Sequence, residues 1–305
     1  MKWLILSFLF CYVTSEDSVS VRKPTQRRFQ LRIVGGEPTT ITAHPYMVQI
    51  LLMGLPHSGA VLLTARHALT AAHCFYYEDG KIPATKLSVR AGSTYSTQGG
   101  SVHRVATYIN YESHTIIWQT YDISVVVLAS RVSNYRSSSV QPASIPPEGY
   151  VVPDDVQVMA VGWGQTDPNC NSSVSITLRH TVIRTIERRA CNALYLHTHL
   201  HVDDTMICAG MPGGGRDACM GDSGGPLVCG GVVVGLVSWG ISCANESYPG
   251  VYTRVASYTD WIMRTVQKHQ NLSLADSVNT AHVDFGLMPL LLGSSIVLIR
   301  SILFF

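Results

Sequence analysis

A glycine-rich segment in the last third of the chain contains residue types suited to nucleophilic catalysis. Residues 221–226 read Gly-Asp-Ser-Gly-Gly-Pro, and a further carboxylate, Asp217, lies six residues before Ser223. A serine hydroxyl is a weak nucleophile unless a base accepts its proton and an acid holds that base in the right tautomer. The flanking glycines allow backbone amides to approach a reacting carbonyl. The segment therefore predicts a reactive serine, provided that a base and an orienting acid exist elsewhere.

A histidine and an aspartate earlier in the chain are candidates for that base and that acid. His73 lies in the sequence Thr-Ala-Ala-His-Cys at positions 70–74, and Asp122 lies in Tyr-Asp-Ile-Ser at positions 121–124. Histidine suits the base because its unperturbed pKa of about 6.5 is close to working pH. Each of these residue types alone is usually structural, so the hypothesis depends on all three coming together in the fold.

The elements expected to position these residues are mainly short strands. Between residues 33 and 256, β-rich runs are separated by Gly, Pro, Ser and Asn, a pattern typical of a sandwich or barrel. The runs expected to form strands include Ser124–Ala129, Val156–Val161, Val232–Trp239 and Val251–Val255. One helix is expected from about Ser257 to Gln270. Its buried face would contain Trp261, Ile262, Thr265 and Val266.

The beginning of the chain has the features of a secretory leader. Lys2 precedes an apolar run, Trp3–Val13, which is too short to span a bilayer and is followed by small residues. We interpret residues 1–15 as a signal peptide, with a buried N-terminal helix as the alternative. Residues 16–32 are polar and basic, and we expect them to form an exposed pro-segment.

The composition argues against several classes of protein. Charged residues make up 14% of the 305 residues and the formal net charge is +2, so there is no electrostatic reason to expect a nucleic-acid partner. The eight cysteines include no Cys-x-x-Cys pair, which disfavours a zinc site and favours disulfides. Candidate glycosylation sequons, which fit a secreted protein, begin at Asn171, Asn245 and Asn271.

The end of the chain changes character twice. Residues 271–286 form a polar spacer, and residues 287–305 form an almost wholly apolar tail that Arg300 interrupts. Small residues at 275–277, the spacer and the tail together favour a GPI-attachment signal. A short membrane-spanning helix is the second interpretation, in which Arg300 is costly unless it snorkels. A core helix is the third, but the preceding domain pattern ends by residue 270 and leaves such a helix no partner.

The segments around His73, Asp122 and Ser223, in this order, resemble those of the trypsin-like (chymotrypsin-fold) serine proteases. The resemblance runs from Ile33 to about residue 270 and so covers most of the mature chain. It implies an all-β fold of two six-stranded antiparallel β-barrels of the trypsin type with a C-terminal α-helix. It also implies a serine endopeptidase.

By this resemblance each of the reactive residues has a role in peptide hydrolysis. His73 acts as general base and then as general acid, Asp122 orients its imidazole, and Ser223 attacks the scissile carbonyl. The backbone amides of Gly221 and Ser223 form the oxyanion hole. The resemblance implies no cofactor, and the sequence gives no reason to expect more than a monomer.

The resemblance also assigns a substrate pocket. Asp217 is implied at its base, where a buried carboxylate would attract an Arg or Lys side chain of a protein or peptide substrate. The residues implied to form the pocket walls and to pair with the substrate backbone are Ser238, Trp239, Gly240 and Gly250. Ser242 departs from the glycine found in similar trypsins, so we expect it to narrow the pocket entrance.

A zymogen is a further implication of the resemblance. Cleavage after Arg32, by another protease or by the protein itself, would free the amino group of Ile33. In this family that ammonium pairs with the aspartate before the nucleophile, here Asp222. Breaking a buried ion pair costs about 3–5 kcal/mol, which is enough to keep the oxyanion hole and the pocket misformed before cleavage.

Two disulfides of the family have both partners in this chain, and these are Cys191 with Cys208 and Cys219 with Cys243. Cys11 lies in the predicted signal peptide, and the three other cysteines do not match. The usual partner of Cys74 would fall near Ser58, and that of Cys229 near Val158. We suggest Cys170 and Cys229 as a third pair and Cys74 as a free, buried thiol, although the connectivity does not follow from sequence.

Metal binding has little support in the sequence. The loop Ser93–Ser101 contains no carboxylate, so calcium dependence is not expected. His197, His199 and His201 alternate and could bind zinc if they lay on a strand, but solvated surface residues are the favoured interpretation.

Two other functions compete with that of an active protease. A binding or regulatory homologue would keep the fold without turnover, but such proteins usually lack a triad residue, and this chain has all three. An adhesion protein is suggested only by the apolar tail. The expected location is extracellular, at the cell surface if the tail is an anchor.

Overall fold

The strands of the first half of the chain come in quick succession and are short. The computed structural model describes residues 33–77, 80–116, 119–167 and 174–270. Its early strands are β1 (Glu37–Pro38), β2 (Met47–Leu52), β3 (Leu55–Leu62), β4 (His67–Thr70), β5 (Tyr76–Tyr77), β6 (Gly80–Lys81), β7 (Leu87–Ala91), β8 (Ser101–Asn110) and β9 (Ser124–Leu128).

The second half adds six strands and both α-helices of the described residues. The strands are β10 (Gln157–Gly162), β11 (Arg179–Ile186), β12 (Met206–Gly210), β13 (Pro226–Cys229), β14 (Val232–Trp239) and β15 (Gly250–Arg254). The helices are α1 (Arg188–Tyr195) and α2 (Thr259–Lys268). Short 3-10 turns lie at Ala72–Phe75, Ala84–Lys86 and Val255–Ser257.

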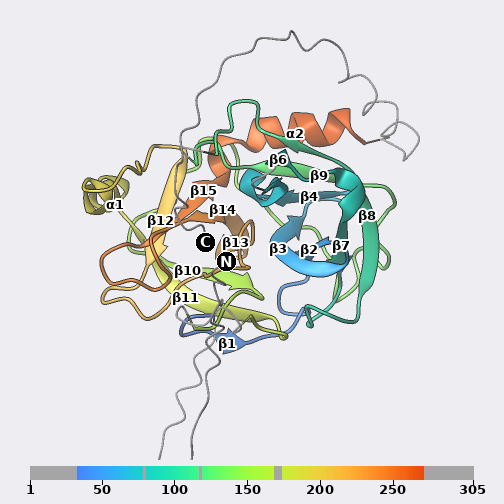
Figure 1. Ribbon diagram of the computed structural model, residues 1–305, viewed down its shortest axis with the longest axis horizontal. Coiled ribbons are helices and arrows are strands. Elements are labelled where there is room, and N and C mark those ends of the chain that lie inside the picture. The colour runs from blue at the N-terminus through green and yellow to red at the C-terminus, as the bar shows by residue number, and fades with distance from the viewer. Residues whose placement is uncertain (1–32, 78–79, 117–118, 168–173, 271–305) are drawn as a thin grey trace, which may run out of the picture. The chain divides into compact units, whose positions relative to one another are not determined.

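Six antiparallel strands close into a first barrel in the order β2-β3-β4-β9-β8-β7 (Figure 1). Its interior is filled by apolar side chains, of which Leu62, Phe75 and Leu128 are fully buried. β9 reads Ser-Val-Val-Val-Leu and is buried along its whole length, because stiff β-branched side chains pack well in a strand. Burial of these apolar side chains is the main favourable contribution to folding.

The second barrel consists of β10 to β15. Its strand order is β11-β10-β13-β14-β15-β12, and pairing between β11 and β12 closes it. β1 extends the edge by pairing with β11. Along β11 buried and half-buried residues alternate, the period expected of a strand with one face on the core. The two antiparallel six-stranded barrels confirm the predicted fold class.

The predicted C-terminal helix is confirmed as α2. Its buried residues are Thr259, Trp261, Ile262, Thr265 and Val266. The helix follows β15 of the second barrel and packs against β9 of the first (Figure 1), so it connects the two barrels. Helix α1 was not predicted, since its eight residues are too few for a clear apolar period. Its N-terminus is capped by the Glu187 carboxylate, which accepts the amides of Arg189 and Ala190.

The structure contains the disulfides Cys191–Cys208 and Cys219–Cys243, the two pairs implied by the resemblance. Cys74 and Cys229 are free thiols. The suggested bridge between Cys229 and Cys170 was therefore wrong, and Cys170 itself lies outside the described residues. The register of β10 with β13 places Val158 opposite Cys229, so an aliphatic side chain occupies the position from which a cross-strand partner would come.

Several predictions concern residues that the structure does not describe. The signal peptide, the pro-segment with Arg32, the polar spacer and the apolar tail all lie outside the described ranges, as do Asn171 and Asn271. Within those ranges, no helix has both the length and the apolar character needed to cross a membrane.

The packing of α2 leads to a first prediction. Ile262→Ala removes a fully buried side chain from the contact between α2 and the barrels. We expect the free energy of unfolding to fall by about 2–5 kcal/mol. The matched change Met263→Ala affects a side chain that is 59% exposed on the same helix, and we expect it to cost less than about 0.5 kcal/mol. Urea denaturation in a Ser223→Ala background, which prevents self-digestion, measures both, and equal losses would contradict the packing of α2.

Candidate active site

The pairing of β4 with β9 brings the candidate base and acid to the same end of the first barrel. Thr70, the last residue of β4, lies opposite Ser124, the first residue of β9. His73 lies in the 3-10 turn that follows β4, and Asp122 lies just before β9. Two residues far apart in sequence therefore become neighbours because of strand register.

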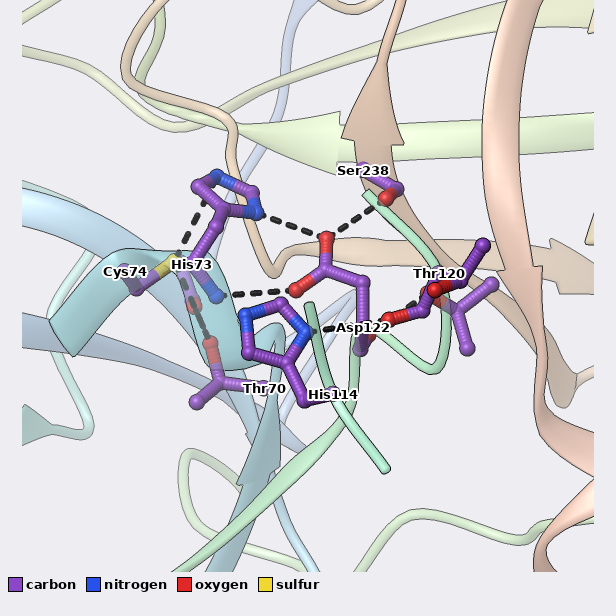
Figure 2. Close-up of polar contacts among 9 residues, drawn as sticks. Thr70, His73, Cys74, His114, Thr120, Asp122 and Ser238 are labelled. Atoms are coloured by element: carbon purple, nitrogen blue, oxygen red, sulfur yellow. Dashed lines mark hydrogen bonds and ion pairs between the residues drawn. The ribbon is translucent and has the colours of Figure 1, made fainter. Parts of the chain in front are cut away.

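The Asp122 carboxylate accepts two hydrogen bonds from His73 (Figure 2). The backbone amide of His73 lies 2.8 Å from Oδ1, and the ring Nδ1 lies 2.7 Å from Oδ2. Because an ionised carboxylate can only accept, Nδ1 carries the proton in this contact. Nε2 is then the ring nitrogen that is able to accept a proton from another group.

Asp122 is 2% exposed, and further donors reach it from the second barrel. Ser238 Oγ on β14 donates to Oδ2 at 2.5 Å, and Thr253 Oγ1 on β15 donates to the Asp122 carbonyl at 2.6 Å. Burial by itself raises the pKa of Asp122, but the charge and the hydrogen bond of His73 outweigh burial and lower it to about 2. The carboxylate is therefore ionised at working pH.

His73 has the opposite shift. Burial favours its neutral form, yet the interactions with the Asp122 carboxylate and with Cys74 together outweigh burial and raise the pKa of His73 well above its usual value. The side chain remains 20% exposed. An imidazole whose protonated form is stabilised in this way is suited to accept a proton during a reaction.

Ser223 lies in a tight turn just before β13. Gly221 and Gly224 have φ angles of 94° and 70° in this turn, a conformation that favours glycine. At Gly224 a β-carbon would lie 1.9 Å from Thr70 Oγ1, so only glycine allows so close an approach to the first barrel. The Ser223 carbonyl accepts the amide of Gly59 on β3 at 2.8 Å. The turn is thus held against the barrel that contains the base.

A pocket in the second barrel has Asp217 among its lining residues. The lining consists of Asp217, Ala218, Cys219, Val237, Trp239, Gly240, Gly250, Val251 and Tyr252. The Asp217 carboxylate accepts the Ala244 amide at 3.1 Å and the Tyr252 hydroxyl at 3.3 Å. At Gly250 a β-carbon would lie 2.8 Å from Asp217 Oδ1, so a side chain there would cover the carboxylate. Burial raises the pKa of Asp217 to about 7, and a cation beside it would favour ionisation.

The unpredicted helix α1 supports one wall of this pocket. Its last residue, Tyr195, packs edge-on against Trp239 with ring centroids 5.1 Å apart. The Tyr195 hydroxyl donates to the Pro249 carbonyl at 2.5 Å. Ser242, in the loop after this wall, has a φ of 73°. Holding a serine in this region costs on the order of 1 kcal/mol.

The first described residues pack near the loop that contains Ser223. Ile33 is fully buried, and the next residue packs on the disulfide of Cys219. Asp222 is 1% exposed, and its carboxylate accepts the amides of Gly164 at 2.7 Å and Cys219 at 3.0 Å. In the described part of the chain it forms no ion pair. Burial accordingly raises the pKa of Asp222 to about 6.

Comparison with known proteins identifies the family. Residues 33–262 match the family model for trypsin. The chain is 40% identical to trypsin CFT-1 of Choristoneura fumiferana over 240 residues, which are 76% of this chain and 90% of that trypsin. It is 38% identical to trypsin alpha of Drosophila melanogaster over 234 residues, 77% of this chain and 87% of the relative. This chain belongs to the trypsin family. It is a serine endopeptidase with the chymotrypsin fold.

A third relative of this trypsin-family protease is alkaline trypsin B of Manduca sexta. The two are 38% identical over 240 residues, 76% of this chain and 90% of the relative. The matched lengths show that the resemblance extends over nearly the whole of these trypsins and is not limited to the segments around the reactive residues.

The trypsin-family site includes contacts that the sequence did not reveal. Ser238 was predicted to pair with the substrate backbone, and its side chain also binds Asp122. Tyr252 and Thr253, neighbours on β15, bind Asp217 and the Asp122 carbonyl. The available signal was two adjacent residues with hydroxyl groups in a predicted strand, since buried polar groups need partners.

Two further predictions concern the protease surface. The Asn245 side-chain oxygen accepts the amides of Ser247 and Tyr248 at 2.8 and 3.2 Å, so this sequon forms a turn of its own. The three alternating histidines at 197–201 are exposed and lie in turns after α1. Within the described ranges, no group of three or more His, Cys, Asp or Glu is arranged to hold a metal ion.

The raised pKa of Asp222 predicts how the uncleaved protein responds to pH. The pKa of the Asp222 carboxyl group in the folded protein, about 6, exceeds its ordinary value. Ionisation of this group therefore lowers the free energy of unfolding progressively as pH rises from about 4 through 6. The full cost is about 3 kcal/mol. In an Arg32→Gln, Ser223→Ala background, Asp222→Asn should therefore lose about 3 kcal/mol less than its parent between pH 4 and pH 8.

Chemical denaturation at the two pH values measures this difference. Asp217 is present in both proteins, so the part of its raised pKa that comes from burial, the largest cause, cancels in the comparison, and only the smaller part that comes from the Asp222 charge does not. Equal losses of stability in the parent and the Asp222→Asn variant would show that Asp222 is already compensated before cleavage.

Proposed function

We propose that this trypsin-family protease cleaves peptide bonds after Arg or Lys and is made as a zymogen that is activated between Arg32 and Ile33. The observation that supports the specificity is the carboxylate of Asp217, buried in a pocket beside the glycine at position 250. A buried carboxylate is stabilised by a partner of opposite charge, and an Arg or Lys side chain of the substrate would supply it.

The proposed reaction follows from the hydrogen bonds of the base. Ser223 Oγ attacks the scissile carbonyl carbon while His73 Nε2 takes the hydroxyl proton, and the same nitrogen then gives that proton to the leaving amine. Asp122 stabilises the imidazolium that forms in between. The amides of Gly221 and Ser223 donate to the oxyanion, a contribution of about 3 kcal/mol for each donor.

The proposed activation step supplies the charge that Asp222 lacks. Cleavage after Arg32 creates a free ammonium at Ile33, and pairing with this ammonium would lower the raised pKa of the Asp222 carboxyl. Because the amides of Gly164 and Cys219 already bind that carboxylate, the new pair would reinforce the loop that holds Ser223. Arg32 suits the proposed pocket, so both self-activation and activation by another protease are compatible with the sequence.

For location we propose secretion with a cell-surface tether. Residues 1–15 have the pattern of a signal peptide, and residues 287–305 have the pattern of a GPI signal or, as the second interpretation, a membrane-spanning tail. Release of the full-length protein from cells by a phosphatidylinositol-specific lipase supports the GPI anchor. Retention after the same treatment contradicts it.

Cleavage of a peptide library tests the proposed specificity. The protein is used after cleavage at Arg32 and without residues 287–305, and products should end in Arg or Lys. Asp217→Ser should lower kcat/KM on such peptides by about 100-fold or more, since a buried ion pair is worth about 3–5 kcal/mol. Gly250→Ala should have a similar effect, because its β-carbon would lie against the carboxylate.

Two controls make the library experiment decisive. Glu246→Gln removes an exposed negative charge from a neighbouring loop and should leave kcat/KM within about twofold. Ser223→Ala should abolish cleavage and labelling by a covalent serine-directed reagent. Cleavage after uncharged residues, or no labelling of the activated parent at Ser223, would refute the proposed function.

A further inference from the structure

The residue after the base has a free thiol that contacts it. Cys74 is 4% exposed, and its Sγ lies 3.8 Å from His73 Nε2 (Figure 2). Thr70 Oγ1 lies 3.9 Å from the same sulfur. The thiol is available because Ser58 stands near the position from which a disulfide partner would come. Sulfur and imidazole nitrogen are thus side by side at the atom on which catalysis depends.

The separation of these two atoms fits two ligands of one metal ion. Zinc binds thiolate sulfur at about 2.3 Å and imidazole nitrogen at about 2.0–2.1 Å. With a tetrahedral angle, sulfur and nitrogen on the same ion lie about 3.6 Å apart. The observed distance of 3.8 Å is close to this value, so small side-chain adjustments are sufficient.

The surroundings of His73 and Cys74 also favour metal binding. Metal-ligating histidines usually donate their second ring N–H to a carboxylate, which orients the ring and makes the free nitrogen more basic. His73 makes this contact through Nδ1 to Asp122, so Nε2 is the oriented nitrogen. The backbone of Cys74 is fixed by His57, whose Nε2 donates to the Cys74 carbonyl at 2.7 Å.

We propose that Cys74 Sγ and His73 Nε2 form an inhibitory site for thiophilic divalent cations such as Zn²⁺ and Cd²⁺. On binding, the S–H bond breaks, its proton and any proton on Nε2 go to solvent, and bonds form from the ion to Sγ and Nε2, with water as the remaining ligands. The Nε2 lone pair is then no longer able to take the proton of Ser223. The inhibitory effect therefore rests on the proposed role of His73 as base.

Two protein ligands make this a reversible regulatory site and not a resident metal centre. The described residues offer no third His, Cys, Asp or Glu that would complete a metal-binding group. Hard cations such as Mg²⁺ prefer oxygen ligands, so they should not inhibit through this pair. Selectivity for soft cations is accordingly part of the proposal.

The inhibition experiment uses Cd²⁺ alone as the probe and the activated protein as the enzyme. The concentration of Cd²⁺ that halves the initial rate should be at least about tenfold lower for the parent than for Cys74→Ser or Cys74→Ala. Cys229→Ser, which removes the other free thiol among the described cysteines, should behave as the parent. Equal sensitivity of the parent and both Cys74 variants would overturn the proposal.

A spectroscopic readout separates metal binding from catalysis. Cadmium–thiolate bonds absorb in the ultraviolet, so Cd²⁺ should produce a new absorption band in the Ser223→Ala protein. The band should be lost when Cys74→Ser is added and should persist when Cys229→Ser is added. If the protein lacks peptidase activity but the band follows this pattern, the proposed function fails and the metal site stands. If the band is absent or survives loss of Cys74, the metal site fails.

Discussion

A buried negative charge where the two barrels meet is the interaction on which the rest of the site depends. The Asp122 carboxylate receives hydrogen bonds from His73 in the first barrel and from Ser238 in the second, and Thr253 of the second barrel donates to the Asp122 backbone carbonyl. An uncompensated charge in this position would cost several kcal/mol. The donors therefore satisfy the carboxylate only when both barrels are folded and correctly docked. The orientation of the histidine is a property of the assembled pair of barrels, and the short turn that carries it would not define it alone.

Three buried aspartates differ in how their negative charge is compensated, and their pKa values differ accordingly. Asp122 has a cationic partner within the fold, and its pKa is lowered to about 2. Among the described residues Asp217 and Asp222 have only neutral donors, and burial raises their pKa to about 7 and about 6. In the proposed mechanism a substrate side chain and a new N-terminus supply the missing cations. In this mechanism the charge of Asp122 is compensated permanently within the fold. The charge of Asp217 would be compensated only when a substrate binds, and that of Asp222 only after cleavage.

The sequence predicted the fold class because the motifs that indicate it are local and specific. The same motifs singled out His73, Asp122 and Ser223 as candidates, and the structure joins the first two by hydrogen bonds. The β-rich runs at β10, β14 and β15 and the apolar face of α2 could be recognised from short segments. Helix α1 was not predicted because it is short and is stabilised by a glutamate cap and a disulfide. The contacts of Ser238 and Thr253 with Asp122 were not predicted because they join residues more than a hundred positions apart. Only strand register brings them together.

The distribution of disulfides divides the molecule into two halves with different chemical requirements. The two bridges among the described residues lie in the second half, and one of them includes Cys219, which lines the pocket that contains Asp217. The described cysteine of the first barrel, Cys74, is unbridged. The ribosome completes this half first, and its core and strand pairing need no oxidant. The first barrel can therefore fold early by packing alone, whereas completion of the pocket that contains Asp217 also depends on oxidation of the Cys219 and Cys243 thiols.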